Sequence, residues 1–81
     1  LLKDGVWRVK YKVNCYKTAL KINTYMINKN MSISELADYL DISSSAVYKW
    51  ATGKSKPSLE VLANLSFLFN VPINELIELE E

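Results

Sequence analysis

The 81-residue chain is long enough for one small domain, with a formal net charge of +1 and 49% hydrophobic residues. One cysteine and no histidine exclude an internal disulfide and a Cys/His zinc site. No apolar run reaches the ~18 residues of a membrane helix, and no catalytic set of side chains is evident. We therefore predict a cytoplasmic domain that is not an enzyme and holds no metal or cofactor.

Charge is distributed unevenly along the chain. Residues 1–30 hold seven basic side chains and one acid (+6), residues 31–57 hold three of each (0), and residues 58–81 hold five Glu and no base (−5), which sum to +1. A basic segment can face phosphates, and an acidic segment is then expected to face away from them. We expect the Glu-rich end of the chain to be solvated and frayed.

The segment from Val6 to Val13 alternates between apolar and basic residues, which is the period of a β-strand. We predict an N-terminal extension over residues 1–13, strand-like or disordered, followed by a helical domain over residues 14–81. The apolar side of the strand would carry Trp7, Val9, Tyr11 and Val13, and its basic side Arg8, Lys10 and Lys12.

A first helix is predicted to run from a cap at Asn14 to about Asn28, with Asn30 in the left-handed conformation as its stop. Ser32 and Glu35 have the spacing of a capping box, which predicts the start of a second helix. The predicted core residues of the first helix are Tyr16, Ala19, Leu20, Ile22, Met26 and Ile27.

Two short helices joined by a tight turn at residues 41–43 are predicted between positions 33 and 52. Such helices must cross steeply and share one small core, and Ala37 is small enough for the close approach. Any of Ser43 to Ser45 can cap the second helix. The predicted core residues are Leu36, Ala37, Leu40, Ile42, Val47 and Trp50. The outer face left to the second helix, Ser44, Ser45, Tyr48 and Lys49, suits the major groove of duplex DNA.

The remainder of the chain predicts two further helices. Ser58 can cap one that ends at Asn70, and Pro72 is well tolerated at the start of the other. The first would bury Leu59, Leu62, Ala63, Leu65 and Phe69, with Val61 and Phe67 broadening its apolar face. The second would bury Ile73, Leu76 and Ile77.

The stretch 33–52 resembles the helix-turn-helix of the phage repressor and Cro (XRE-like) family. The run Gly53-Lys54-Ser55-Lys56-Pro57-Ser58 looks like a loop of that family, and the resemblance covers residues 20 to 78. It implies an all-α, five-helix domain that binds duplex DNA and regulates transcription, most often as a repressor. The alternative that we keep is a protein-interaction module of the same fold, such as an antitoxin or adaptor.

The resemblance also assigns site residues. It implies that Ser44, Ser45, Tyr48 and Lys49 read bases, and that Ile33, Ser34, Thr52, Lys54 and Lys56 meet phosphates. Ile33 replaces the family's Gln, so the helix N-terminus alone would attract the anion there. Asp41 stands where the family has Gly in the turn, and Met26 with Ala51 replaces its Arg–Glu pair. Loss of both charges avoids stranding one of them in the core.

Two side chains have a second interpretation. Trp50 could be a stacking platform for single-stranded nucleic acid, but its spacing from Val47 favours the core. Cys15 could be a redox sensor, but a lone structural thiol is the simpler interpretation.

One helix-turn-helix covers only a few base pairs, so we predict a homodimer on a roughly palindromic site, with recognition helices about 34–36 Å apart. The last helix, through Ile73, Ile77 and Leu79, is our preferred dimer surface. Pairing of two copies of the strand at Val6–Val13 is the alternative. The same segment could also be an edge strand, an unattached arm, or a basic arm that touches DNA.

Overall fold

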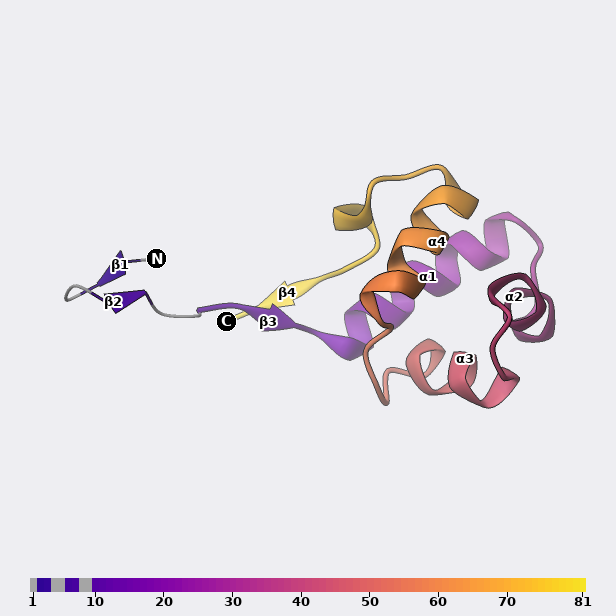
Figure 1. Cartoon of the computed structure of the whole chain (residues 1–81), viewed down its shortest axis with the longest axis horizontal. Coiled ribbons are helices and arrows are strands. Elements are labelled where there is room, and N and C mark those ends of the chain that lie inside the picture. The colour runs from indigo at the N-terminus through magenta and orange to yellow at the C-terminus, as the bar shows by residue number, and fades with distance from the viewer. Residues whose placement is uncertain (1, 4–5, 8–9) are drawn as a thin grey trace.

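The computed structural model describes residues 2–3, 6–7 and 10–81. In that part of the chain, four α-helices form the body of the molecule, and two small antiparallel ribbons lead away from it (Figure 1). The helices are α1 (Cys15–Asn28), α2 (Ile33–Leu40), α3 (Ser44–Ala51) and α4 (Leu59–Phe69), followed by a 3-10 turn η1 (Ile73–Glu75). The strands are β1 (Leu2–Lys3), β2 (Val6–Trp7), β3 (Lys12–Val13) and β4 (Leu79–Glu80).

The helix ends lie where the capping residues predicted them. Asn14, Ser43 and Ser58 each accept a hydrogen bond from the backbone N–H three residues ahead. Ser32 and Glu35 form the predicted capping box, and these hydrogen bonds lower the pKa of the Glu35 carboxyl below its usual value. The helix-stop residues Asn30, Asp41 and Asn70 all have φ of 55°, which confirms that Asp41 can replace glycine in the turn.

One core joins all four helices. Met26 and Ala51 both lie in it, so the two apolar residues that replace the family's ion pair are buried in one cluster, as predicted. Leu40 and Ile42 pack against it while remaining half-buried. Its members are Ile22, Met26, Leu36, Ala37, Val47, Trp50, Ala51, Leu65, Phe69 and Leu76.

Several predicted core residues are wrong. On α1, Tyr16, Leu20 and Ile27 are 65%, 50% and 76% exposed, because α1 turns inward the face that carries the other predicted core residues, Ala19, Ile22 and Met26. That face includes the buried hydroxyl of Thr18 and the half-buried ring of Tyr25, which stacks on Phe69 at 5.4 Å between ring centroids.

The apolar stripe on the outer side of α4 was likewise predicted to be buried and is exposed. Leu59 is 75% exposed, Phe67 is 83% exposed, and Ala63 between them is also exposed. The helix packs instead through Leu65 and Phe69, with Val61, Leu62 and Leu68 half-buried beside them. An exposed apolar stripe at helical spacing therefore follows the whole length of α4.

The predicted fifth helix is replaced by something shorter. Its first residues form only the 3-10 turn η1, after which Leu76 enters the core completely and the chain extends into β4. The fold of the described chain is therefore mostly helical with four α-helices, and the five-helix prediction is wrong.

The acidic end of the chain is paired with the basic N-terminal segment. Strand β4 lies antiparallel to β3, with Lys12 opposite Glu80 and Val13 opposite Leu79. Ion pairs join Lys10 to Glu81 (3.5 Å) and Lys12 to Glu80 (3.9 Å). We call residues 10–13 and 79–81 the terminal ribbon. The prediction of a frayed, solvated acidic end is wrong, because nearby lysines offer it partners.

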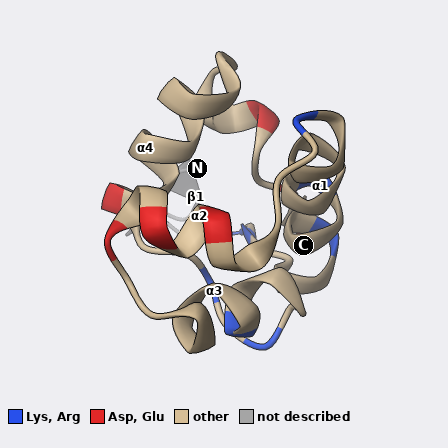
Figure 2. Cartoon of the chain, turned by 90° about the vertical axis from the view of Figure 1, so that its right-hand side faces the viewer, with Lys and Arg blue, Asp and Glu red and all other residues tan. Residues whose placement is uncertain are grey.

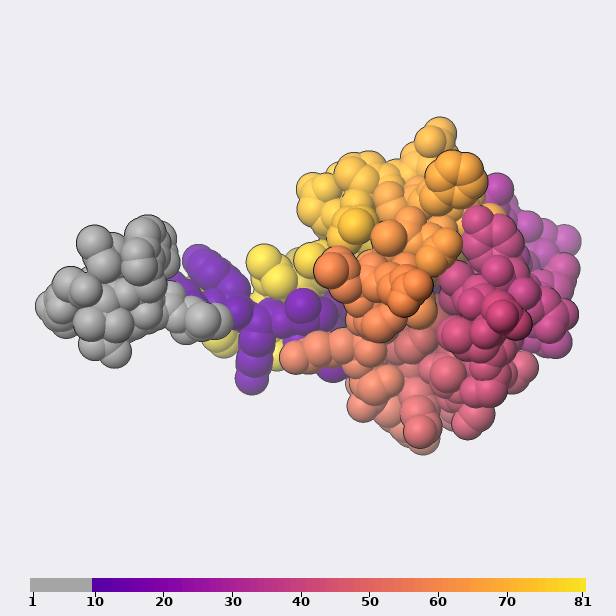
Figure 3. All heavy atoms as spheres, in the orientation of Figure 1, coloured from indigo at the N-terminus to yellow at the C-terminus, as the bar shows by residue number. Residues whose placement is uncertain are grey.

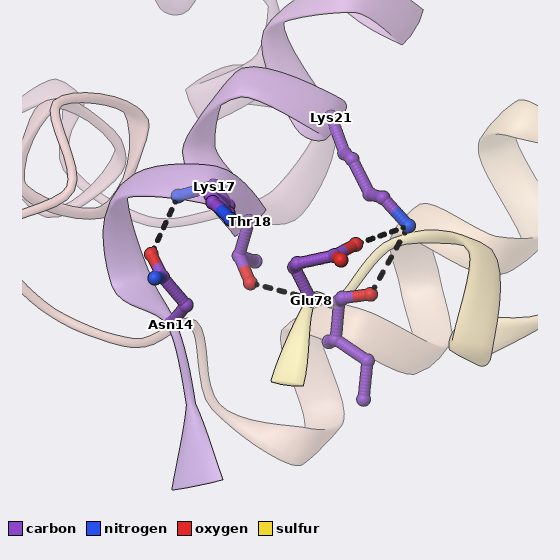
Figure 4. A network of polar contacts seen from close by, with 6 residues as sticks. Asn14, Lys17, Thr18, Lys21 and Glu78 are labelled. Atoms are coloured by element: carbon purple, nitrogen blue, oxygen red, sulfur yellow. Dashed lines mark hydrogen bonds and ion pairs between the residues drawn. The ribbon is translucent and has the colours of Figure 1, made fainter. Parts of the chain in front are cut away.

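The terminal ribbon is anchored to the start of α1 (Figure 4). The backbone N–H of Glu78 donates to the buried hydroxyl of Thr18 at 3.0 Å. The Lys21 ammonium lies 3.0 Å from the Glu78 carboxylate and also donates to the Ile77 carbonyl. The hydrogen bond from Lys21 lowers the pKa of Glu78, and the charge of the ammonium adds to the effect.

Among the described residues, none of the helices is both long and apolar enough to cross a membrane.

Candidate nucleic-acid interface

Helix α3 is held against α2 and α1 by its inner face. The turn between α2 and α3 closes through the N–H of Ile42, which donates to the Ala37 carbonyl at 3.1 Å. At the other end, the Asn23 side-chain amide on α1 donates to the Ala51 carbonyl at 2.8 Å. With Val47 and Trp50 buried, the opposite face of α3 is directed to solvent.

The four predicted base-reading residues share this outer face. Ser44, Ser45, Tyr48 and Lys49 are all exposed. The Lys54 ammonium lies 5.5 Å from the centroid of the Tyr48 ring, which is a cation–π distance. The outer face of α3 therefore presents two hydroxyls, a phenol and the Lys49 charge, and the following loop adds the Lys54 charge beside the phenol.

The loop after α3 is shaped by Gly53 and Thr52. Gly53 has φ of +79°, and a Cβ on it would lie 3.0 Å from the Cα of Tyr16, so the loop crosses the start of α1 closely. The Thr52 hydroxyl donates to the Tyr48 carbonyl at 2.7 Å, and its backbone N–H donates to the same oxygen. Both donors of Thr52 are thus used to end α3 and do not point outward.

The start of α2 offers backbone donors. Ile33 is half-buried against the core, whereas Ser34 is exposed. The N–H groups of a helix's first turn lack partners within the helix. Because the Ser32 hydroxyl takes the N–H of Glu35, those of Ile33 and Ser34 remain for an anion.

A groove of about 350 Å³ lies between α3 and the segment that leads into α4. Lys49 and Lys56 line it together, although they come from different elements. Three serines of this groove, Ser43, Ser55 and Ser58, were not predicted as site residues. Ser43 and Ser58 could be recognised from the sequence only as helix caps. Their place in this groove depends on how α3 and α4 are arranged in space.

The charged side chains within residues 42–59 are all positive. Residues 42–59 include Lys49, Lys54 and Lys56 and no acid. The nearest acids in the sequence, Asp41 and Glu60, line the adjoining groove between α2 and α4, which shares Ile42, Ser58 and Val61 with the groove beside α3. Figure 2 shows basic positions on and below α3 and also at α1, and acidic positions on α2 and toward α4. A polyanion would therefore meet attraction along the α3 side.

A profile of the helix-turn-helix family matches residues 22–76. The chain belongs to the helix-turn-helix family. The HTH-type transcriptional activator BcrR of Enterococcus faecalis is 38% identical over 61 residues, which are 75% of this chain and 30% of BcrR. The chain therefore spans less than a third of that relative.

Solved structures show the same helix-turn-helix fold. The restriction-modification controller protein C.AhdI from Aeromonas hydrophila has a TM-score of 0.69 at 21% identity, over 76% of this chain and 94% of C.AhdI. The clp gene regulator ClgR from Corynebacterium glutamicum has a TM-score of 0.70 at 15% identity, over 80% of this chain and 69% of ClgR.

Every predicted site residue lies inside the region matched to the helix-turn-helix family. The terminal ribbon, formed by residues 10–13 and 79–81, lies outside it. The candidate interface thus lies within the matched helix-turn-helix region, whereas the paired chain ends lie outside it.

Proposed function

We propose that this helix-turn-helix protein binds duplex DNA in a sequence-specific manner and regulates transcription, with α3 in the major groove. The observation that carries the proposal is the exposed outer face of α3, which carries Lys49 and continues into a loop with two more lysines, with no acid anywhere in residues 42–59. We assign DNA binding to residues 14–81 and treat residues 1–13 as an extension.

Base reading is assigned to the outer face of α3. Lys49 suits the acceptors of guanine, and Tyr48 can hydrogen-bond a base or contact a thymine methyl. Ser44 and Ser45 are short, so they would reach bases only where α3 enters deepest. The Lys54 ammonium over the Tyr48 ring restricts that ring while leaving it 51% exposed.

Phosphate binding is assigned to both flanks of α3. On one flank, the backbone N–H groups of Ile33 and Ser34 attract an anion with the helix dipole of α2. On the other, Lys54 and Lys56 supply charge. Thr52 belonged to the predicted phosphate set, but its donors are used within α3. We propose instead that Thr52 fixes the start of the loop after α3.

We also propose that the protein acts as a homodimer on a roughly palindromic site, because one recognition helix covers too few base pairs for useful specificity. Repression is the outcome that the family resemblance favours. The relative BcrR is named an activator. A reporter gene placed behind the selected site would distinguish repression from activation.

Lys54→Ala and Lys56→Ala are expected to weaken binding to all duplexes alike. Each lost phosphate contact should reduce the slope of log affinity against log salt by about one unit at most. Titration of duplex DNA at several salt concentrations measures both quantities. The controls are Lys54→Arg and Lys56→Arg, which keep the positive charge and should keep the slope. Unchanged affinity and slope in both alanine variants would remove these lysines from the interface.

Tyr48→Ala and Lys49→Ala are expected to change which sequences bind best while leaving the fold intact. A good base contact contributes about 1–3 kcal/mol of discrimination. Selection of bound sites from random duplex DNA, repeated for each variant, measures the preference. If both variants keep the wild-type ranking of sites, α3 does not read the bases. If the wild type binds no duplex even at low salt, the protein-interaction alternative takes its place.

A further inference from the structure

We propose that the terminal ribbon is the contact between two copies of this chain on DNA, with its apolar face packed against the same face of the second copy. This inference rests on the proposed DNA-binding homodimer and names its surface. It replaces the predicted surface on a fifth helix, since the chain makes only the short turn η1 there.

The two faces of the terminal ribbon differ in character. Val13 lies opposite Leu79, and Tyr11 lies two residues before Val13, so these three side chains share one face. Tyr11 is 51% exposed and Leu79 is 53% exposed. On the other face, Lys12 pairs with Glu80. The charged side chains of one face are thus paired within the chain, while the apolar side chains of the other face remain exposed to water.

A ribbon this small is marginal by itself. Two-stranded sheets need a further strand or a packing partner for stability in water. Thr18 and Lys21 contact Glu78 and Ile77 at the inner end of the ribbon. Asn14 donates to the Glu78 carbonyl and, through its side chain, to the Glu80 carboxylate, which is the outermost of these contacts. Figures 1 and 3 show that the ribbon then leads away from the helices, so its outer end has no helix beneath it.

Charge permits a second copy at this surface. The terminal ribbon contains Lys10 and Lys12 with Glu80 and Glu81, two charges of each sign that pair within the chain. Two ribbons can therefore meet without net repulsion. The exposed apolar side chains of α1, Tyr16, Leu20 and Ile27, are less suited to a second copy, because the exposed Lys17 lies beside Leu20 on the helix surface and would approach its counterpart.

The position of the terminal ribbon favours it over α4. In Figure 1, α2, then α3 with its loop, and then the ribbon follow one another along the long axis of the molecule. If α2 and the loop hold the two sides of one major groove, this direction runs along the duplex, toward a neighbouring half-site. The stripe of Leu59 and Phe67 belongs to α4, which lies in front of α1 in that view and outside this row of elements.

The contact would be small. Stable dimers bury about 800 Å² on each partner, and the ribbon offers only a few apolar side chains. Two half-sites on one duplex raise the effective concentration of the second copy to the millimolar range. We therefore expect dimer contacts to appear as cooperative binding to paired half-sites.

The experiment compares a duplex carrying one selected half-site with one carrying two inverted half-sites about one helical turn apart. The ribbon variant Tyr11→Gln/Leu79→Gln leaves the net charge unchanged. It should bind the single half-site with an affinity within twofold of wild type. Its cooperativity on the paired site should fall at least tenfold. The matched control is Leu59→Gln/Phe67→Gln, which removes the more exposed apolar pair on α4 and should keep the cooperativity.

Loss of cooperativity in the α4 variant with retention in the ribbon variant would overturn the proposal, as would two independent wild-type chains on the paired site. Cross-linking provides a test that needs no DNA. In a Cys15→Ser background at millimolar protein, Leu79→Cys should form an interchain disulfide at least tenfold faster than Phe67→Cys. Equal rates would contradict the ribbon contact, whereas a wild type that binds no duplex would contradict only the proposed function.

Discussion

Trp50→Ala is expected to lower the free energy of unfolding by about 3–5 kcal/mol. The Trp50 side chain is only 5% exposed and lies in the cluster that joins α3 to the other helices. A domain of this size has a total stability near the low end of about 5–15 kcal/mol, so much of the variant should be unfolded at room temperature. Urea denaturation followed by far-UV circular dichroism measures the change.

Phe67→Ala is the control for the tryptophan variant, since Phe67 is an aromatic residue that is 83% exposed. Surface substitutions of this kind usually change stability by less than about 0.5 kcal/mol. Wild-type stability in Trp50→Ala would place the indole outside the core. The stacking of single-stranded nucleic acid on Trp50 would then have to be tested again.

Leu76→Ala is expected to cost about 2–5 kcal/mol, although Leu76 lies in no helix. It follows η1, is completely buried, and is the core residue that the C-terminal segment contributes. A cavity at this position would also loosen the chain just before Ile77 and Glu78, which anchor the terminal ribbon. Thermal unfolding measures the effect, and for a domain of this size each 1 kcal/mol shifts Tm by about 4–8 °C.

The control for Leu76 is Leu79→Ala, three residues further along, where the side chain is 53% exposed. The two variants delete the same atoms from neighbouring positions, so their difference reports burial alone. Equal stabilities of these two variants would mean that the C-terminal segment does not complete the core. The terminal ribbon would then be held only by its contacts with the start of α1.

Local sequence was sufficient to predict the helix-turn-helix and most of its boundaries. Ser32, Ser43 and Ser58 cap helices through bonds to residues three positions away, and Asp41 ends α2 through its own backbone conformation. Such interactions need no distant partner. The exposed face of α3 was predictable for the same reason, because burial of Val47 and Trp50 leaves Tyr48 and Lys49 outside.

Tertiary structure decided which of several apolar faces is buried. Helix α1 has apolar residues around much of its circumference, so Tyr16 and Ile27 appeared as suitable for the core as Ile22 and Met26. The neighbouring helices select one face, and the others remain in water. The same applies to Phe67 on α4. Periodicity identifies the buried face of a helix only when the opposite face is polar.

The sequence by itself determined the family, the turn, the caps and the outward face of α3, because each depends on residues a few positions apart. Only the tertiary structure placed Ser55 in a groove with Lys49 and joined the two chain ends. The buried hydroxyl of Thr18 shows why: its partner is the N–H of Glu78, 60 residues away. Opposite charges in the two ends were visible in the sequence, but they could have paired with many surfaces. The burial of Leu76 and the bond to Thr18 bring the acidic end to β3 and exclude the other pairings.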